Sequence, residues 1–541
     1  MDTMNYVLVV NVGPVQGFIA TARKTRDLWF GSWLLSELSI RAAEVIEHEC
    51  GGTIISPARD RTAGGMMVNR ITAVLDLSGL QVLDKLLLPK LIARLEEEWS
   101  HLDAPSTLGG LDPNVDAVAQ LRDLPECVWA AVPISSDYKS ARDEAERLVA
   151  ARKTTRDFAP VTWGAPKAKS SLDGVRKSVI PHEAYALADA SPEERQRYHD
   201  ELYRKYKAGP AERLSAVDLL KRHGGDKHPV PSTSHMAALP LVMRMEANVA
   251  LVGAKVGDLL EALKKAGVDL QTLRDTLHDS AMVGGNDASF LFESRLTEDP
   301  LGKPLPQAQV DDAVSALRAF FKSLGPGWMT YPYYALLVAD GDNMGVVVDA
   351  QETREQHGAL SQALSAFALR AAEIVDSAAY RGLTVYTGGD DVLALLPVHT
   401  ALACARQLHD EFHVALQEFR AVDPQGETVT PSLSVGIVIA HHLEPLSEVL
   451  RLGRAAEGAA KGIRVVDKSG VKEKDAIAVT LAKRSGANRT IAGRWASGID
   501  QRLCDFVDMH LANSIPDGAG YELQTLHYRL GAIGANPSEE L

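Results

Sequence analysis

Hydrophobic and polar positions between residues 333 and 440 change period in a fixed order. A near-continuous apolar run of strand length, YYALLVAD, ends at Asp340. Apolar residues then recur every three or four positions over 360–378, which predicts an amphipathic helix. Two short strands, LTVY and VLALL, flank the turn 387–391, a second helical pattern covers 402–419, and the strand SLSVGIVIA follows. The order strand, helix, hairpin, helix, strand predicts the split βαβ arrangement called ferredoxin-like.

The N-terminal part of the chain repeats this order. YVLVVNVG predicts a strand, 15–49 is helical, GTIIS and RITAVLDL form a hairpin pattern, 84–100 is helical, and VWAAVPIS predicts a last strand. Asn11 occupies roughly the position of the first carboxylate, and this hairpin has no Gly-Gly-Asp-Asp turn. We therefore predict two palm-like domains, of which the second alone carries an acidic site. The alternative is a coincidence, because this element order is common.

The predicted fold class is α+β, with two ferredoxin-like palm (nucleotide cyclase-like) domains and helical middle and C-terminal domains. A length of 541 residues suits three or four domains at ~150 residues each. The boundaries that we predict are 1–165 for the first palm-like domain, 166–330 for a mainly helical middle domain, 331–482 for the palm with the acidic turn, and 483–541 for a small helical domain. In the middle domain, PAERLSAVDLLKRHGG is helical and HPVPSTSHMAALP is loop-like.

Composition, charge and cysteine spacing narrow the class of protein. The chain is 46% hydrophobic and 24% charged with a net charge of -14, so a nucleic-acid contact has to use a local basic patch. Cys50, Cys127, Cys404 and Cys504 lie far apart without a Cys-x-x-Cys pair, which predicts free thiols in a reducing compartment. Asp2 stands where a signal peptide carries positive charge, and no apolar run approaches the ~18 residues of a bilayer span. We therefore expect a cytoplasmic protein without a membrane partner.

The turn in YTGGDDVLALLP places two carboxylates side by side. A tight turn explains Gly388 and Gly389, but Asp390 and Asp391 repel each other beside an apolar strand and call for a cation. Oxygen ligands favour a hard divalent ion, Mg²⁺ or Mn²⁺. The first strand of a split βαβ unit lies beside the hairpin, so Asp340 becomes a third carboxylate. The sequence predicts two metal ions held by these three aspartates and a hydroxyl attack on phosphorus, which is nucleotidyl transfer.

The segment DGDNMG, 340–345, supports a nucleotide site, because glycines beside a strand end let backbone amides face a triphosphate. Asp342 is either a further ligand or a turn cap, and the cap is the preferred interpretation. Lys461, in the helical segment RAAEGAAKGI, either reaches phosphate oxygens or is a solvated helix lysine. The predicted nucleotide-binding set is Gly341, Asp342, Asn343, Gly388, Gly389, Ser434 and Lys461.

The segment ARKTRDLWFGSWLLSE, 22–37, combines cations with aromatic residues. Arg23, Lys24 and Arg26 suit contacts to an RNA backbone, and neighbouring aromatic rings suit base stacking; these rings are Trp29, Phe30 and Trp33. The alternative is a helix whose aromatic residues lie in the core and whose cations are solvated, and the periodicity favours this alternative.

Seven segments together resemble the large polymerase/cyclase subunit of type III CRISPR effector complexes, of the Cmr (III-B) kind. VGPVQGFIATARKTRDLWFGSWLLSELS, SSLDGVRKSVI, RLSAVDLLKR, PSTSHMAALP, YYALLVADGDNMG, YTGGDDVLALLP and LSVGIVIAHH follow the family pattern in order. The resemblance implies an antiviral subunit that assembles with CRISPR RNA and smaller subunits, especially those flanking the palms. It implies that the palm converts ATP into cyclic oligoadenylate once target RNA pairs. Asp390 and Asp391 correspond to the family's catalytic pair, and Asp340 corresponds to its strand-end metal ligand.

The sequence departs from the family pattern in two places. Many members begin with an HD nuclease domain, whereas this chain opens on the first palm-like strand, so we expect no DNA cleavage. Many carry zinc-binding cysteines where Ser170, Ser171 and Asp173 stand here, so we expect no zinc. Two alternatives keep the resemblance: a palm that joins ATP to S-adenosylmethionine, and a non-catalytic scaffold subunit. A diguanylate cyclase shares the palm, but here the turn continues into Val392 and Leu393 rather than an acidic-phenylalanine pair.

Overall fold

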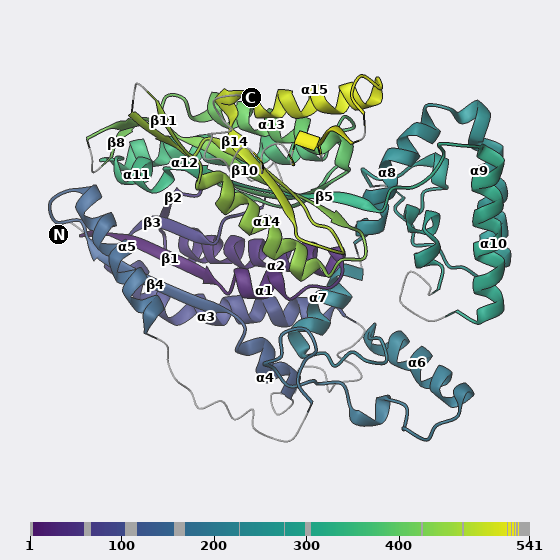
Figure 1. The fold of residues 1–541 in the computed structure, drawn as a ribbon. Helices are drawn as coiled ribbons and strands as arrows, with labels where there is room; N and C mark the ends of the chain where they lie inside the picture. The colour runs from purple at the N-terminus through teal and green to yellow at the C-terminus, as the bar shows by residue number, and fades with distance from the viewer. Residues whose placement is uncertain are drawn as a thin grey trace.

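The computed structural model shows two β-sheets, one above the other, with helices between and around them (Figure 1). A lobe built from α9 (Val249–Lys265) and α10 (Gln307–Leu324) lies beside the two sheets. The residues that the structure describes are 4–58, 66–102, 116–155, 168–297 except 227 and 275, 305–467 except 424 and 425, 470–516, 518–520, 522, 523, 525 and 529.

The first palm domain has the strand order β2-β3-β1-β4, with every pair antiparallel. This is the order of a split βαβ unit and confirms the predicted fold. Alternate residues of β1 face opposite sides, because successive side chains of a strand do so. Leu8 and Val10 pack on α2 and α3, whereas Val9 packs on α5. The elements are β1 (Asn5–Gly13), α1 (Gln16–Ala20), α2 (Thr25–Glu44), a π-helix (Val45–Glu49), β2 (Thr53–Ser56), β3 (Arg70–Asp76), α3 (Leu77–Ser100), α4 (Asp116–Arg122), β4 (Glu126–Pro133) and α5 (Tyr138–Thr154).

The second palm domain repeats this order as β10-β5-β7-β6 within a six-stranded sheet. Its elements are β5 (Tyr333–Asp342), α11 (Met344–Asp349), α12 (Arg354–Val375), β6 (Leu383–Gly388), β7 (Asp391–Leu396), α13 (Val398–Leu416), β10 (Ser432–His441) and α14 (Leu446–Lys461). Two short ribbons are attached, β8 (Ala421–Val422) with β9 (Thr428–Val429), and β11 (Arg464–Asp467) with β12 (Gly470–Glu473).

The sheet of the second palm continues past residue 482, where we predicted the domain to end. β13 (Ala476–Leu481) pairs in parallel with β10, and β14 (Arg489–Arg494) pairs with β13. A 3-10 helix (Trp495–Ser497) and α15 (Ile499–Leu511) follow this sheet. β14 therefore belongs to the sheet of the second palm although it lies beyond residue 482.

Helices cover both faces of the second sheet. Ala335 and Leu337 of β5 pack in a core with α12 and α13, while Leu336 faces the opposite side. On that side α14 lies directly on the sheet, and a Cβ added at Gly436 would lie 2.2 Å from the backbone nitrogen of Glu457. This close approach requires glycine and brings the C-terminal turn of α14 toward the end of β5.

The middle region is mainly helical, as predicted, with α6 (Pro192–Tyr206), α7 (Ala216–Asp226) and α8 (Thr233–Glu246) preceding the lobe. The prediction of a loop in HPVPSTSHMAALP is wrong from Thr233 onward. Ser232 caps α8 by accepting a hydrogen bond from the backbone N–H of His235, and the helix contains Pro240. Burial of the α8 side chains outweighs the helix-breaking tendency of the proline. None of the described helices combines the length and apolar character that a bilayer span requires.

Candidate active site

The Gly-Gly-Asp-Asp turn closes the hairpin between β6 and β7. Gly388 pairs with Asp391, and Gly389 has a φ of +65°, which favours glycine. A Cβ at Gly388 would lie 2.1 Å from the hydroxyl oxygen of Tyr386 and 3.0 Å from Val68 of the first palm. The two glycines therefore allow the turn to approach the first palm closely, while the two aspartates follow at the start of β7.

The turn forms part of the wall of a cavity of about 400 Å³ between the two palm domains. This volume lies within the ~300–1,000 Å³ range of small-molecule sites. The second palm contributes residues 387–391 and one side of α12, and the first palm contributes residues 66–70. The α12 side chains at the wall are His357, Ser361, Leu364, Ser365, Ala368 and Leu369. Residues separated by some 300 positions thus line one cavity, and both palms are needed to build it.

Both aspartates of the turn have raised pKa values. Burial raises the pKa of Asp390 to about 6. Although part of the Asp391 side chain is exposed, desolvation by the surrounding protein raises its pKa to about 7, and the negative charges of Asp390 and Glu457 add to this effect. In both side chains the surroundings disfavour the ionised carboxylate. A cation bound beside them would stabilise that ionised form.

Asp340 lies at the same strand end but faces α14. Ala339 pairs with Val392, so Asp340 is one ladder step beyond, next to the start of the turn. Its carboxylate forms an ion pair with the ammonium of Lys461, which also bonds Glu457 at 2.9 Å. Burial, with a contribution from Lys474, lowers the pKa of Lys461 to about 8. Lys461 is therefore partly exposed and neutralises Asp340, and its contact with a phosphate stays a prediction.

The part of the chain that the structure describes contains no group of three or more histidine, cysteine, aspartate or glutamate side chains placed to hold a metal ion. Asp390 packs on the opposite side of β5 from the carboxylate of Asp340, since a Cβ at Gly341 would lie 2.7 Å from the Cβ of Asp390. The metal role of Asp340 therefore stays a prediction.

Asp342 is a buried acceptor and not a turn cap. Its Oδ2 accepts hydrogen bonds from the hydroxyls of Ser432 and Ser434, each at 2.8 Å, and from the backbone N–H of Asp475 at 3.0 Å. Its Oδ1 is buried without a hydrogen-bond partner, and burial raises the pKa of this carboxyl. The cap interpretation is wrong because the strand pleat turns Asp342 toward β10. The hydroxyl of Ser434 is buried and committed to Asp342.

Asn343 precedes α11 in the left-handed conformation, with a φ of 63° and no side-chain cap hydrogen bond. Its side-chain oxygen accepts a hydrogen bond from the ammonium of Lys474 at 2.8 Å. The sequence analysis missed Lys474, Asp475 and Glu457. A signal exists only for Glu457, which stands four residues before Lys461 in the i,i+4 spacing of helical ion pairs.

The predicted RNA-contacting residues lie elsewhere, at the start of α2. They line a cavity of about 700 Å³ at the junction of the first palm, the middle region and the segment before α14. Arg23 is half exposed and bonds Glu212 at 3.3 Å. Burial, followed by the charge of Arg222, lowers the pKa of Lys24 to about 7. Arg26 is only 6% exposed, and its contact with RNA stays a prediction.

The aromatic residues of the same segment belong to the core, as the periodicity favoured. Phe30 is 1% exposed, and its ring lies 5.1 Å from that of Trp33. Trp29 packs beside His228 with ring centroids 4.8 Å apart. These rings fix α2 against the middle region and are not presented as a stacking surface for bases.

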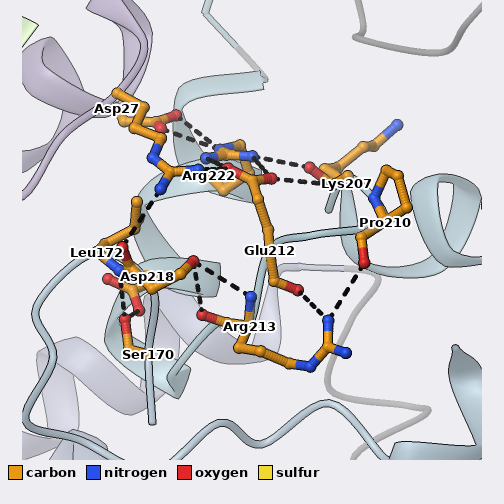
Figure 2. A network of polar contacts seen from close by, with 12 residues as sticks. Asp27, Ser170, Leu172, Lys207, Pro210, Glu212, Arg213, Asp218 and Arg222 are labelled. Atoms are coloured by element: carbon orange, nitrogen blue, oxygen red, sulfur yellow. Dashed lines mark hydrogen bonds and ion pairs between the residues drawn. The ribbon is translucent and has the colours of Figure 1, made fainter. Parts of the chain in front are cut away.

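A buried charge network holds this junction together (Figure 2). The guanidinium of Arg222, which is 1% exposed, donates to Asp27 at 2.9 Å and to Glu212 at 3.1 Å. In the neighbouring part of the network Asp218 accepts from the hydroxyl of Ser170 at 2.6 Å. A buried arginine of this kind is stable only when its donors are satisfied, so the network defines the relative positions of the first palm and the middle region.

A ferredoxin-like sheet with an acidic hairpin turn facing an interdomain cavity defines a palm domain of the nucleotidyl cyclase class. Residues 333–478 match the family model described as Cas10/Cmr2, second palm domain, and residues 7–103 match the one described as CRISPR-associated protein Cmr2, N-terminal. Two segments of the chain are thus similar to domains of the Cas10/Cmr2 family.

Known relatives agree with this assignment. The CRISPR system Cmr subunit Cmr2 of Pyrococcus furiosus is 30% identical over 263 residues, which cover 41% of this chain and 27% of the relative. The apo Type III-B Cmr-beta structure has a similar chain, with a TM-score of 0.58 and 16% identity over 90% of this chain and 70% of that chain. The Cmr-beta structure bound to cognate target RNA gives a TM-score of 0.55 and 16% identity, over 91% and 72% of the two chains. At this identity the structural matches establish the fold.

Proposed function

We propose that this chain is the large subunit of a type III CRISPR RNA-guided effector complex and that its second palm converts ATP into cyclic oligoadenylate. The observation that carries the proposal is the position of Asp390 and Asp391 on the wall of the cavity between the palms. The proposed partners are CRISPR RNA, target RNA and the subunits that flank the palms. In the proposed reaction the 3′-hydroxyl of one nucleotide attacks the α-phosphorus of another, a P–O bond forms and pyrophosphate leaves.

The carboxylates of the turn fit a divalent metal ion. Magnesium is commonly bound by one or two protein carboxylates with phosphate oxygens completing its shell. Asp390 and Asp391 are hard oxygen donors whose pKa values are raised to about 6 and about 7, and a cation would reverse that unfavourable charge. When bound, Mg²⁺ or Mn²⁺ would stabilise charge on the reacting phosphate. A second ion on Asp340 requires the ion pair with Lys461 to open first.

The other walls have separate tasks in this proposal. The glycines of the turn let its backbone pack closely against Tyr386 and Val68, because no Cβ keeps these side chains away. The hydroxyl of Ser365 on α12 lines the cavity and would orient a polar group of the nucleotide, whereas the buried hydroxyl of Ser361 accepts a hydrogen bond from the backbone N–H of Ala58 at 2.7 Å. Arg70 of the first palm also lines this cavity and carries a positive charge to offset the triphosphate.

The test supplies the purified complex with labelled ATP, with and without complementary target RNA, and identifies any product by mass. We expect oligoadenylate only with target RNA, and no product when Asp390 and Asp391 are both changed to alanine while assembly is unchanged. Asp505→Ala, an exposed position on α15, is the matched control. Unaltered product yield in the double variant would reject the catalytic assignment. A product that contains S-adenosylmethionine would support the alternative reaction, and the absence of any product would support a scaffold.

We further propose that Arg23 and Lys24 contact RNA phosphates at the junction cavity. Arg23 is the member of this group with a half-exposed guanidinium, at the mouth of a cavity large enough for a phosphate-sugar unit. We expect Arg23→Ala to weaken RNA binding and to lower the salt dependence by about one unit of log–log slope. Arg147→Ala on the exposed face of α5 is the control, and an equal effect in both variants would reject a specific contact.

A further inference from the structure

Arg142 is a fully buried cation of the first palm that reaches into the second. It lies on α5, and its side chain is 0% exposed. Its Nη1 donates to the carbonyl oxygens of Val348 and Gln351, both at 3.0 Å, and its Nη2 donates to the carbonyl of Asp349 at 3.3 Å. The three carbonyls belong to the C-terminal end of α11 and the residues just after it. One guanidinium thus binds the end of a helix in the other domain.

The arrangement satisfies every donor of the guanidinium. The remaining N–H groups, on Nε and Nη2, donate to the Oδ1 of Asp143 at 3.2 and 2.8 Å. Burying arginine is costly unless all five of its N–H groups are paired and its charge is offset. The last carbonyls of a helix are unpaired within the helix and carry partial negative charge, so they are suitable partners. A lysine could not reproduce this planar fork.

α11 connects this contact to the acidic site. The helix has 6 residues and begins directly after the segment from Asp340 to Asn343. Its first residue, Met344, packs on Gly341, where an added Cβ would lie 2.8 Å from the Met344 Cγ. The same Cβ would lie 2.7 Å from the Cβ of Asp390. A helix this short is not stable by itself, so its position depends on contacts at its two ends.

We propose that Arg142 is a positioning residue for the acidic site. By holding the C-terminal end of α11 it fixes Met344 against Gly341, and Gly341 in turn fixes the side chain of Asp390. The first palm, which has no acidic turn of its own, thereby sets the geometry of the second. The catalytic part of this inference rests on the proposed conversion of ATP, whereas the structural part does not.

A second contact of α5 provides the comparison. The hydroxyl of Tyr138 bonds the Nδ1 of His357 at 2.8 Å, and His357 lies on α12 rather than α11. Burial lowers the pKa of His357 to about 4, so this hydrogen bond involves a neutral ring. Tyr138→Phe removes a buried contact between the same two domains without touching α11. It separates general docking of the domains from positioning of the acidic loop.

The experiment compares Arg142→Lys with Tyr138→Phe and with Arg147→Lys, whose side chain is 69% exposed on the same helix. Hydrogen exchange in the assembled complex is followed for residues 340–352, and kcat and KM for ATP are measured. In Arg142→Lys we expect exchange in this segment to rise about tenfold, and kcat to fall about 10- to 100-fold, as a misplacement near 1 Å does, while KM changes less than about threefold. Arg147→Lys should match the parent chain. Tyr138→Phe should leave exchange over 340–352 unchanged and lower kcat less than Arg142→Lys does, because His357 lines the cavity.

Several results would decide the matter. Unchanged exchange over 340–352 in Arg142→Lys, or the same loss of kcat in Tyr138→Phe, overturns the proposal. If Arg142→Lys fails to assemble, Asp143→Asn, which removes the carboxylate that orients the guanidinium, should produce a smaller change of the same kind, and no change there overturns it. If the parent complex makes no product, the proposed function fails, and exchange alone decides whether Arg142 fixes the acidic loop.

Discussion

The two palm domains share one strand order but carry opposite chemistry at corresponding strand ends. In the first palm Asn11 pairs with Arg70 across β1 and β3. In the second palm Ala339 of β5 pairs with Val392 of β7. The next residue of each strand toward the turn is an aspartate, so Asp340 lies beside Asp391. An amide and a cation thus stand where the other copy has two carboxylates. The fold tolerates both sets because these positions lie at the ends of the strands, outside the apolar core that holds each palm together.

This difference indicates that the two palms contribute side chains of opposite charge to the cavity between them. The second palm brings acidic groups to one wall, and the first palm brings Arg70 to the other, where it pairs with Glu146 at 2.7 Å. The first palm also provides Arg142, which binds the end of α11. A copy that lacks the acidic turn therefore still contributes to the site.

We expect the largest loss of activity when an aspartate of the second palm is replaced by the arginine found at the corresponding position of the first palm. Asp391→Arg places a cation at the position that corresponds to Arg70, where it would repel a metal ion and pair with Asp390. We expect ATP conversion to fall about 10³-fold or more, which corresponds to about 4 kcal/mol in activation free energy. Product formation by the assembled complex measures this. Activity within tenfold of the parent chain would show that Asp391 has no part in the reaction.

A smaller effect is expected on the opposite wall. Arg70→Ala removes the positive charge that offsets the triphosphate, and its half-exposed position limits the contribution to about 1 kcal/mol. We expect the KM for ATP to rise about fivefold with kcat nearly unchanged. Steady-state kinetics measure both values, with Arg147→Ala as the control. A fall in kcat alone would contradict a role in ground-state binding.

Lys461→Met tests whether Asp340 is available to a metal ion. The ammonium of Lys461 occupies the cation position beside Asp340, so its removal should lower the Mg²⁺ concentration for half-maximal activity by about threefold. Titration of Mg²⁺ at fixed ATP measures the change. A higher Mg²⁺ requirement, or a raised KM for ATP with no change in the Mg²⁺ requirement, would instead indicate that Lys461 binds phosphate as the sequence first indicated.

The smallest effect concerns pH. The pKa values of Asp390 and Asp391 are raised to about 6 and about 7, above the ordinary value near 3.9, so the folded chain binds more protons than the unfolded chain between these limits. Their contribution to stability is therefore present below pH ~4 and is lost as pH rises toward 7. Without metal, Tm should fall over this window by more in the parent chain than in Asp390→Asn/Asp391→Asn. Parallel curves for the two chains would refute the raised pKa values, and added Mg²⁺ should oppose the loss.

The sequence by itself determined the elements and their order. Apolar spacing at two or at three to four residues specifies strand or helix, because a side chain's face depends on local backbone geometry alone. The order of elements then predicted both split βαβ units, and the turn at 388–391 was visible as a string of glycines and aspartates. These features depend on residues close together in the chain.

Only the tertiary structure decided which way the charged side chains point and what they meet. Asp340 faces Lys461 across 121 positions of sequence, Asp342 meets two serines of β10, and Arg142 meets α11 from another domain. Each outcome follows from strand pleat and from the packing of elements distant in sequence, and a buried polar group takes whichever partner that packing brings within hydrogen-bond distance. The pattern of neighbouring residues in the sequence does not specify such a partner. The residues of the site were therefore predictable, and their contacts were not.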